Sequence, residues 1–161
     1  MGVSGSGKST LGALLAQALH VPFLEGDSFH PPDNVARMAA GIALTDADRE
    51  GWLRTLAAQL KQHAAAGVVL SCSALKRRYR DTLRSGAPDM ALLYLRGTQD
   101  VLEQRMAGRS GHYMPPSLLA SQLATLEPPQ GDEHALTLDV AHDPQQLVHE
   151  TLAWLGRSHA A

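Results

Sequence analysis

The first residues of the chain carry glycines, serines and a lysine at a spacing typical of phosphate binding. Residues 2–9 (GVSGSGKS) match the pattern G-x-x-x-x-G-K-[ST] and lead directly into an apolar helical pattern. Glycines let such a loop turn tightly and bring backbone N–H groups close to phosphate oxygens. Lys8 would supply a cation to the β- and γ-phosphates of ATP, and the Ser9 hydroxyl would bind Mg²⁺. The predicted nucleotide-binding residues are Gly2, Val3, Ser4, Gly5, Ser6, Gly7, Lys8, Ser9 and Thr10.

Two polar side chains follow the next apolar run, in the segment EGDSFHPPDN at residues 25–34. In open α/β sheets, ligands bind beyond the carboxyl ends of the strands, so Asp27 and His30 are placed to face the γ-phosphate and a phosphoryl acceptor. The Asp27 carboxylate could accept a hydrogen bond from an attacking hydroxyl and take its proton. The alternatives are that Asp27 caps a turn and that His30 only braces the loop.

Two basic regions are candidates for binding an anionic group. The segment TDADRE at residues 45–50 predicts a helix start, with Arg49 in its first turn. Arg49 is either an ordinary surface charge or a planar fork for a carboxylate or phosphate. Residues 76–80 (KRRYR) place four cations within five positions. Because cations at a helix start oppose the helix dipole, we expect an anionic ligand to offset them.

The apolar run that precedes this basic segment ends without the acidic residue that often binds magnesium in phosphate-loop proteins. Cys72 and Ser73 occupy that region. Magnesium would then depend on Ser9, phosphates and water, with Asp27 as an outer-sphere group. Cys72 is interpreted as a small buried residue and not as a nucleophile.

A last basic pair lies in the segment RMAGRSGHYM at residues 105–114. Arg105 and Arg109 are four residues apart and would share one helix face. Glycines 108 and 111 flank Arg109 and could act as hinges of a lid that closes over the transferring phosphate and excludes water. The alternative is a helix that ends in basic residues, which suit its dipole.

Extended and helical patterns alternate along the chain, which is typical of an α/β fold with a parallel sheet flanked by helices. The predicted strands are Val21–Leu24, Val68–Cys72, Ala91–Leu95 and Leu136–Val140. Apolar positions at helical spacing lie before, between and after them, as in Leu11, Leu14, Leu15 and Leu19 before the first strand. A buried strand normally precedes a phosphate loop, yet only Met1 precedes Gly2. We therefore expect that the first strand is truncated and that the natural protein has several more apolar residues upstream.

Length and composition restrict the remaining possibilities. With 161 residues the chain fits a single domain, and 44% hydrophobic against 19% charged residues is typical of a globular protein. A formal charge of −2 offers no general attraction to nucleic acid or to an anionic membrane. The chain has no apolar run of about 18 residues that could span a bilayer. One cysteine and the absence of an export signal predict a cytoplasmic protein.

Together these residues resemble the gluconokinase family, small P-loop kinases that phosphorylate D-gluconate at its 6-hydroxyl with ATP. The resemblance covers nearly the whole chain. It runs through residues 2–9, 26–31, Asn34, Met38, Gly41, Leu44, Asp46, 48–49, 52–53, 72–76, 79–81, 111–112, 114–115, 121–122 and 125–127. Only the phosphate loop is common to all P-loop relatives. The rival interpretations are a shikimate-type kinase and a nucleotide-binding module without catalysis.

The resemblance implies a fold, partners and roles for individual residues. The fold is a single P-loop kinase domain over residues 1–161, with the strand order of nucleoside-monophosphate kinases and a lid segment near residues 105–127. The implied partners are ATP, Mg²⁺, D-gluconate and a second copy of the chain in a homodimer. The implied site residues are Lys8, Ser9 and Thr10 for ATP and Mg²⁺, Asp27, His30 and His112 for the sugar, Arg49 and Lys76 for its carboxylate, and Arg105 and Arg109 for the phosphates. Lys8, Asp27 and Arg109 would be the catalytic residues.

Overall fold

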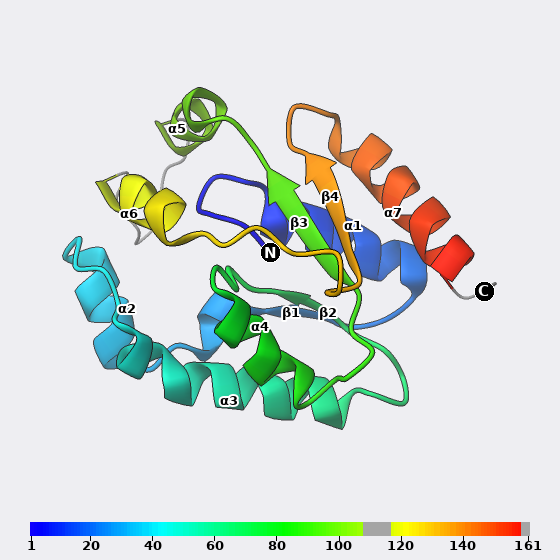
Figure 1. Cartoon of the computed structure of the whole chain (residues 1–161), viewed down its shortest axis with the longest axis horizontal. Helices are drawn as coiled ribbons and strands as arrows, with labels where there is room; N and C mark the ends of the chain where they lie inside the picture. Colours follow the sequence, from blue (N-terminus) through cyan, green and yellow to red (C-terminus); the bar gives the residue numbers. More distant parts are fainter. Residues whose placement is uncertain (108–116, 159–161) are drawn as a thin grey trace.

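The computed structural model describes residues 1–107 and 117–158, with helices and strands alternating along the chain (Figure 1). Within these two ranges, no helix is both long enough and apolar enough to cross a lipid bilayer. The elements in chain order are α1 (Lys8–Leu19), β1 (Phe23–Glu25), the 3₁₀ turn η1 (Gly26–Phe29), α2 (Pro32–Ala39), α3 (Asp46–Gln62), β2 (Val69–Ser71), α4 (Arg77–Arg84), β3 (Leu92–Arg96), α5 (Gln99–Ala107), α6 (Ser117–Thr125), β4 (Ala135–Asp139) and α7 (Pro144–Ser158).

All four predicted strands are present, each shifted by one or two residues at its ends. β1 pairs with β2 in parallel, with Phe23 opposite Val69, and β3 pairs with β4 in parallel, with Leu92 opposite Ala135. The apolar pattern locates the buried side chains, whereas a strand ends where hydrogen bonding to its partner stops. The predicted parallel α/β arrangement is therefore confirmed.

The first two residues lie between the two strand pairs (Figure 1). The Met1 carbonyl accepts a hydrogen bond from the Leu95 N–H at 3.0 Å, and the Met1 amino group donates to the Leu93 carbonyl. On the other side, the Gly2 N–H donates to the Ser73 carbonyl at 3.1 Å. Residues 1 and 2 thus link β3 to the segment after β2, so the phosphate loop begins at the centre of the strand array.

Helices cover both faces of this array. Along β3, Leu92 and Tyr94 pack with α3 and α4, whereas the neighbouring Leu95 packs with α1 and α7. Successive side chains of a strand point to opposite faces, so this division shows that both faces of β3 are buried. Figure 1 shows α3 and α4 on one side of the strands and α1 and α7 on the other.

A third apolar cluster holds the segments at the carboxyl ends of the strands together. It consists of Val3 from the phosphate loop, Leu75 after β2, Leu102 of α5 and Leu119 of α6. All four side chains are nearly inaccessible to solvent. Their packing fixes the phosphate loop against three other segments of the same edge of the fold.

A buried ion pair ties α4 to the segment that follows α6. The Arg80 Nη2 donates to Glu133 at 2.8 Å, and the Arg80 and Glu133 side chains are 1% and 0% exposed. Arg80 Nη1 also donates to the Ala74 and Glu127 carbonyls at 3.2 and 3.0 Å. The hydrogen bond from Arg80 to the Glu133 carboxyl lowers the pKa of that carboxyl to about 2. Arg80 therefore fixes both the loop after β2 and the end of the segment after α6.

Arg80→Met is expected to lower the free energy of unfolding by about 3 kcal/mol, because it removes the buried guanidinium from the Glu133 carboxylate and leaves only the more distant Arg84 and Arg77 as cationic partners. The Arg54–Glu50 pair is the matched control, since its side chains are 68% and 63% exposed. Arg54→Met is expected to change stability by less than about 0.5 kcal/mol. Urea denaturation of both variants measures the difference, and equal effects would contradict the structural role of Arg80.

Candidate active site

The predicted phosphate loop forms a compact turn in front of α1. The Lys8 Nζ donates a hydrogen bond to the Val3 carbonyl at 2.9 Å. The Ser6 hydroxyl donates to the same carbonyl at 2.8 Å, and Ser6 itself is buried. The loop therefore folds around the Val3 carbonyl, which places the Lys8 ammonium over the loop and not out in solvent.

Gly5 and Gly7 of the loop adopt backbone conformations that other residues rarely reach. Gly5 has a φ of +79°, and a Cβ there would lie 2.9 Å from the Leu102 carbonyl oxygen. Gly7 has a φ of +89° and precedes α1 without a side-chain hydrogen bond to the first turn. Ser9 and Thr10 of that turn are exposed. The positive end of α1 is therefore left for an anion, as the sequence pattern predicts.

Two side chains from distant helices lie beside the loop. Arg105 of α5 donates to the Val140 carbonyl, and its Nη1 is 3.7 Å from the position of a Cβ added to Gly7. On α6, the Oε1 of Gln122 accepts a hydrogen bond from the Ser4 N–H at 2.7 Å. Arg105 thus lies where the sequence analysis expects it, next to the phosphate loop.

The turn after β1 places Asp27 and His30 at the carboxyl edge of the strands, also as expected. The His30 N–H donates to the Asp27 carbonyl at 3.3 Å within this turn. Burial, and then the positive charge of Arg49, lowers the pKa of His30 to about 4. His30 is therefore neutral at pH 7. Its ring can then donate a hydrogen bond to a hydroxyl or accept one from it, but it carries no charge.

The His30 pKa has a consequence for stability at low pH. Unfolding restores its pKa to about 6.5, so between pH 6.5 and 4 the unfolded chain binds more protons than the folded protein. The free energy of unfolding therefore falls as the pH is lowered through this range. His30→Asn removes the titrating ring, so we expect a smaller loss of stability between pH 7 and pH 5 than in the wild type. Urea denaturation at the two pH values tests this, and an equal loss in both proteins would contradict it.

The cations of residues 76–80 have partners within the protein. Lys76 Nζ lies 3.0 Å from Asp46, which also pairs with Arg78, and Arg80 pairs with Glu133. These carboxylates offset the cations within the folded chain, so the basic run does not by itself require an anionic ligand. The carboxylates come from the start of α3 and from the segment before β4, which folding brings beside α4.

The predicted anion-binding residues Arg49 and Lys76 meet at one aromatic ring. The Arg49 guanidinium carbon is 5.7 Å from the centroid of the Tyr79 ring, and Lys76 Nζ is 5.8 Å from it. The Tyr79 hydroxyl donates to Asp46, the same carboxylate that pairs with Lys76. With Arg78 at 5.6 Å from the same centroid, three cations lie around a buried ring that attracts positive charge.

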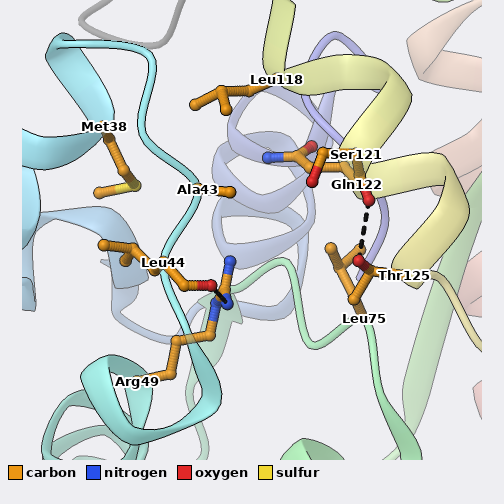
Figure 2. Close-up of a pocket in the computed structure, with 9 residues that line it drawn as sticks. All are labelled: Met38, Ala43, Leu44, Arg49, Leu75, Leu118, Ser121, Gln122 and Thr125. Atoms are coloured by element: carbon orange, nitrogen blue, oxygen red, sulfur yellow. Dashed lines mark hydrogen bonds between the residues drawn. The ribbon is translucent and has the colours of Figure 1, made fainter.

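Figure 2 shows a pocket between the segment that follows α2, the start of α3 and the helix α6. The Arg49 side chain extends into it from α3, and its guanidinium donates to the Leu44 carbonyl. Gln122 faces the pocket from α6, so its side chain borders both the pocket and the phosphate loop. The residues that line the pocket are Met38, Ala43, Leu44, Arg49, Leu75, Leu118, Ser121, Gln122 and Thr125.

The nucleotide side and the acceptor side converge at the end of β2. The Gly2 N–H at the start of the phosphate loop donates to the Ser73 carbonyl at 3.1 Å, and a Cβ added to Gly26, directly before Asp27, would lie 2.2 Å from the Ser71 carbonyl oxygen. Cys72 lies between these two contacts, and burial raises the pKa of its thiol to about 12, so it is protonated at neutral pH. This agrees with the interpretation of Cys72 as a packing residue, and the start of the loop and the Asp27 turn meet at the end of β2.

Two predicted site residues, Arg109 and His112, lie outside the described residues, as do glycines 108 and 111. The structure adds side chains that the sequence analysis left without a role: Trp52, Tyr79, Asp46 and Gln122. Three of them contact predicted site residues directly, and Gln122 contacts the loop. Their signal in the sequence was only their presence in the motifs shared with the resembling family.

Comparison with known families defines the class of protein. A family model described as shikimate kinase matches residues 4–152. With the parallel strands, the loop before α1 and the charged groups at the carboxyl edge, this match identifies a small P-loop kinase.

Closer relatives define the family. The chain is 42% identical to the thermoresistant gluconokinase of Escherichia coli K12 over 155 residues, which cover 94% of this chain and 89% of that protein. A gluconokinase from Sinorhizobium meliloti 1021 superposes with a TM-score of 0.87 at 49% identity, covering 98% and 89% of the two chains. An unliganded sugar kinase from Janibacter sp. HTCC2649 gives a TM-score of 0.92 at 49% identity, covering 97% and 91%. The chain belongs to the gluconokinase family.

Proposed function

We propose that this protein transfers the γ-phosphoryl group of ATP to the 6-hydroxyl of D-gluconate, giving 6-phospho-D-gluconate and ADP. The observation that carries the proposal is that the phosphate loop and the Asp27 turn both contact the end of β2, at one edge of the strands, in a chain that belongs to the gluconokinase family. The product, 6-phospho-D-gluconate, would then enter carbohydrate acid catabolism.

On the nucleotide side, the backbone N–H groups at the end of the loop, before and within the exposed first turn of α1, bind the phosphates, whereas the Gly2 and Ser4 N–H groups bond within the protein. Lys8 neutralises charge on the transferring group, and Arg105 approaches the loop from α5. Arg109 is proposed to act with Arg105, although it lies outside the described residues.

Magnesium fits this site through Ser9, whose hydroxyl is an oxygen donor exposed in the first turn of α1. Among the described residues, no group of three histidine, cysteine, aspartate or glutamate side chains is arranged to hold a metal ion. Ser9, phosphate oxygens and water would therefore hold Mg²⁺. When bound, the ion neutralises negative charge on the phosphates.

On the acceptor side, Asp27 and His30 bind the hydroxyls of gluconate, and Arg49 and Lys76 attract its carboxylate. Arg49 is suited to this because it enters the pocket with a planar, permanently charged group. Lys76 pairs with Asp46, which fixes its position beside the Tyr79 ring. His112, outside the described residues, is proposed to complete the substrate contacts.

Phosphoryl transfer then follows an in-line course. The 6-hydroxyl oxygen of gluconate forms a bond to the γ-phosphorus, the bond from that phosphorus to the β–γ bridging oxygen breaks, and ADP leaves with that oxygen. The hydroxyl proton passes to the Asp27 carboxylate. Most of the rate increase comes from alignment of the two substrates and from the positive groups that face the transferring phosphoryl.

An assay of ADP release with gluconate, with shikimate and with ATP alone tests the proposal. We expect rapid ADP release with gluconate only, and mass spectrometry should detect one phosphate ester on the product. Faster turnover of shikimate would favour the shikimate-type alternative. ATP binding without ADP release under any condition would favour a nucleotide-binding module and would contradict the proposal.

The assembly and domain organisation extend the same proposal. We propose a single kinase domain with a lid near residues 105–127, acting as a homodimer. Light scattering coupled to size-exclusion chromatography measures the mass of the assembly directly.

A further inference from the structure

Trp52 of α3 contacts the acceptor-side turn in two ways. Its indole ring stacks on the His30 ring, with the ring centroids 4.0 Å apart and the planes 16° from parallel. Its Nε1–H donates a hydrogen bond to the Gly26 carbonyl at 2.8 Å, directly before Asp27 in the chain. Trp52 is 1% exposed, so it has no direct access to a substrate.

The turn itself is held tightly on its other side. A Cβ added to Gly26 would lie 2.2 Å from the Ser71 carbonyl oxygen, so the backbone of the turn packs directly against the end of β2. The turn is therefore fixed between the β2 backbone and the indole N–H. Asp27 follows immediately, and its carboxylate has no hydrogen bond or ion pair within the described residues.

The His30 ring depends on the indole for its orientation. Its Nδ1 is buried and has no hydrogen-bond partner in the part of the chain that the structure describes. Hydrogen bonds normally fix the orientation of a buried imidazole, and here the nearly parallel stack on Trp52 takes that role.

The helix that carries Trp52 is also well fixed. Thr45 caps α3 by accepting a hydrogen bond from the Asp48 N–H, and the Asp48 carboxylate accepts one from the Thr45 N–H. This reciprocal capping box fixes the start of α3 two turns before Trp52. Trp52 therefore connects the turn that carries Asp27 to a helix whose start is fixed by its cap.

We propose that Trp52 is a positioning residue for phosphoryl transfer, which aligns Asp27 through the Gly26 carbonyl and orients His30 by stacking. The inference rests on the proposed function, because it assigns Trp52 a role through Asp27 and His30. A residue that only stabilises the core would affect folding, whereas a residue that aligns the base affects kcat.

Trp52→Phe is the direct test, because it keeps an aromatic face for His30 and removes the N–H that binds Gly26. We expect kcat for gluconate to fall about 10-fold to 100-fold, with the KM for ATP unchanged. Leu60→Ala is the matched control, since Leu60 lies in the same helix and the same apolar cluster but away from the turn. It should lower the melting temperature and leave kcat unchanged. Trp52→Tyr replaces Trp52→Phe if the phenylalanine variant does not fold.

A double-variant cycle separates positioning from general damage. In an Asp27→Asn background, Trp52→Phe should cause little further loss of kcat, because the group that it aligns is already inactive. Losses that multiply in the double variant, or an equal fall of kcat in Leu60→Ala, would overturn the inference. Activity of the wild type with gluconate is measured first. If the wild type is inactive, the proposed function fails, whereas an active wild type with an unaffected Trp52→Phe variant rejects only the role of Trp52.

Discussion

Replacing Lys8 by alanine is expected to abolish phosphorylation of gluconate while leaving the fold intact. Lys8 is the first residue of α1, and its Nζ is held over the loop by the Val3 carbonyl at 2.9 Å. Loss of this ammonium leaves charge on the transferring phosphoryl without its nearest mobile cation. We expect kcat to fall by at least about a thousandfold, measured by ADP release at saturating ATP and gluconate.

Two further lysine variants define the cause. Lys8→Arg keeps the charge but replaces a compact ammonium by a planar guanidinium, so we expect only a small part of the activity to return. Lys61→Ala removes an exposed lysine from the last turn of α3 and should retain full activity. Thermal melting followed by circular dichroism verifies that each variant is folded. Turnover of Lys8→Ala close to that of the wild type would contradict the assignment of the loop.

Features determined by neighbouring residues in the chain were predictable. The phosphate loop depends on glycine spacing and on the helix that follows it, and both are visible in residues 2–9. The Thr45 cap of α3 is equally local, since it needs only the residue three positions later. Strand positions followed from short apolar runs. Local patterns therefore predicted the class of fold and the nucleotide side of the candidate site.

Contacts between distant segments could not be predicted from local patterns. Lys76 pairs with Asp46 30 positions away, and Ser4 bonds Gln122 118 positions away. In the sequence alone, a run of basic residues predicts an anion site. The carboxylates that pair with it are distant in the chain and are identified only in the folded structure. The same holds for Trp52, whose spacing indicates only a core position in a helix. Its contact with the Asp27 turn depends on how α3 packs against η1.

Asp27→Asn is the second variant with a large expected effect. The change keeps the size of the side chain and its place in η1, two residues after β1, but an amide cannot accept the hydroxyl proton. We expect kcat for gluconate to fall by at least about a hundredfold, with little change in the KM for ATP. Steady-state kinetics with gluconate as the varied substrate measure both constants.

The division of the loss between kcat and KM decides what Asp27 does. A fall in kcat means that the carboxylate acts mainly in the transition state, as a base or as the group that aligns the hydroxyl. A loss confined to the KM for gluconate would instead make Asp27 a binding group, and the proton would then leave by another route. Asp33→Asn is the matched control, because Asp33 is an exposed carboxylate in the first turn of α2 and should not affect either constant. If Asp27→Asn and Asp33→Asn lose the same activity, the loss is caused by the lower negative charge at the carboxyl edge of the strands and not by the position of Asp27.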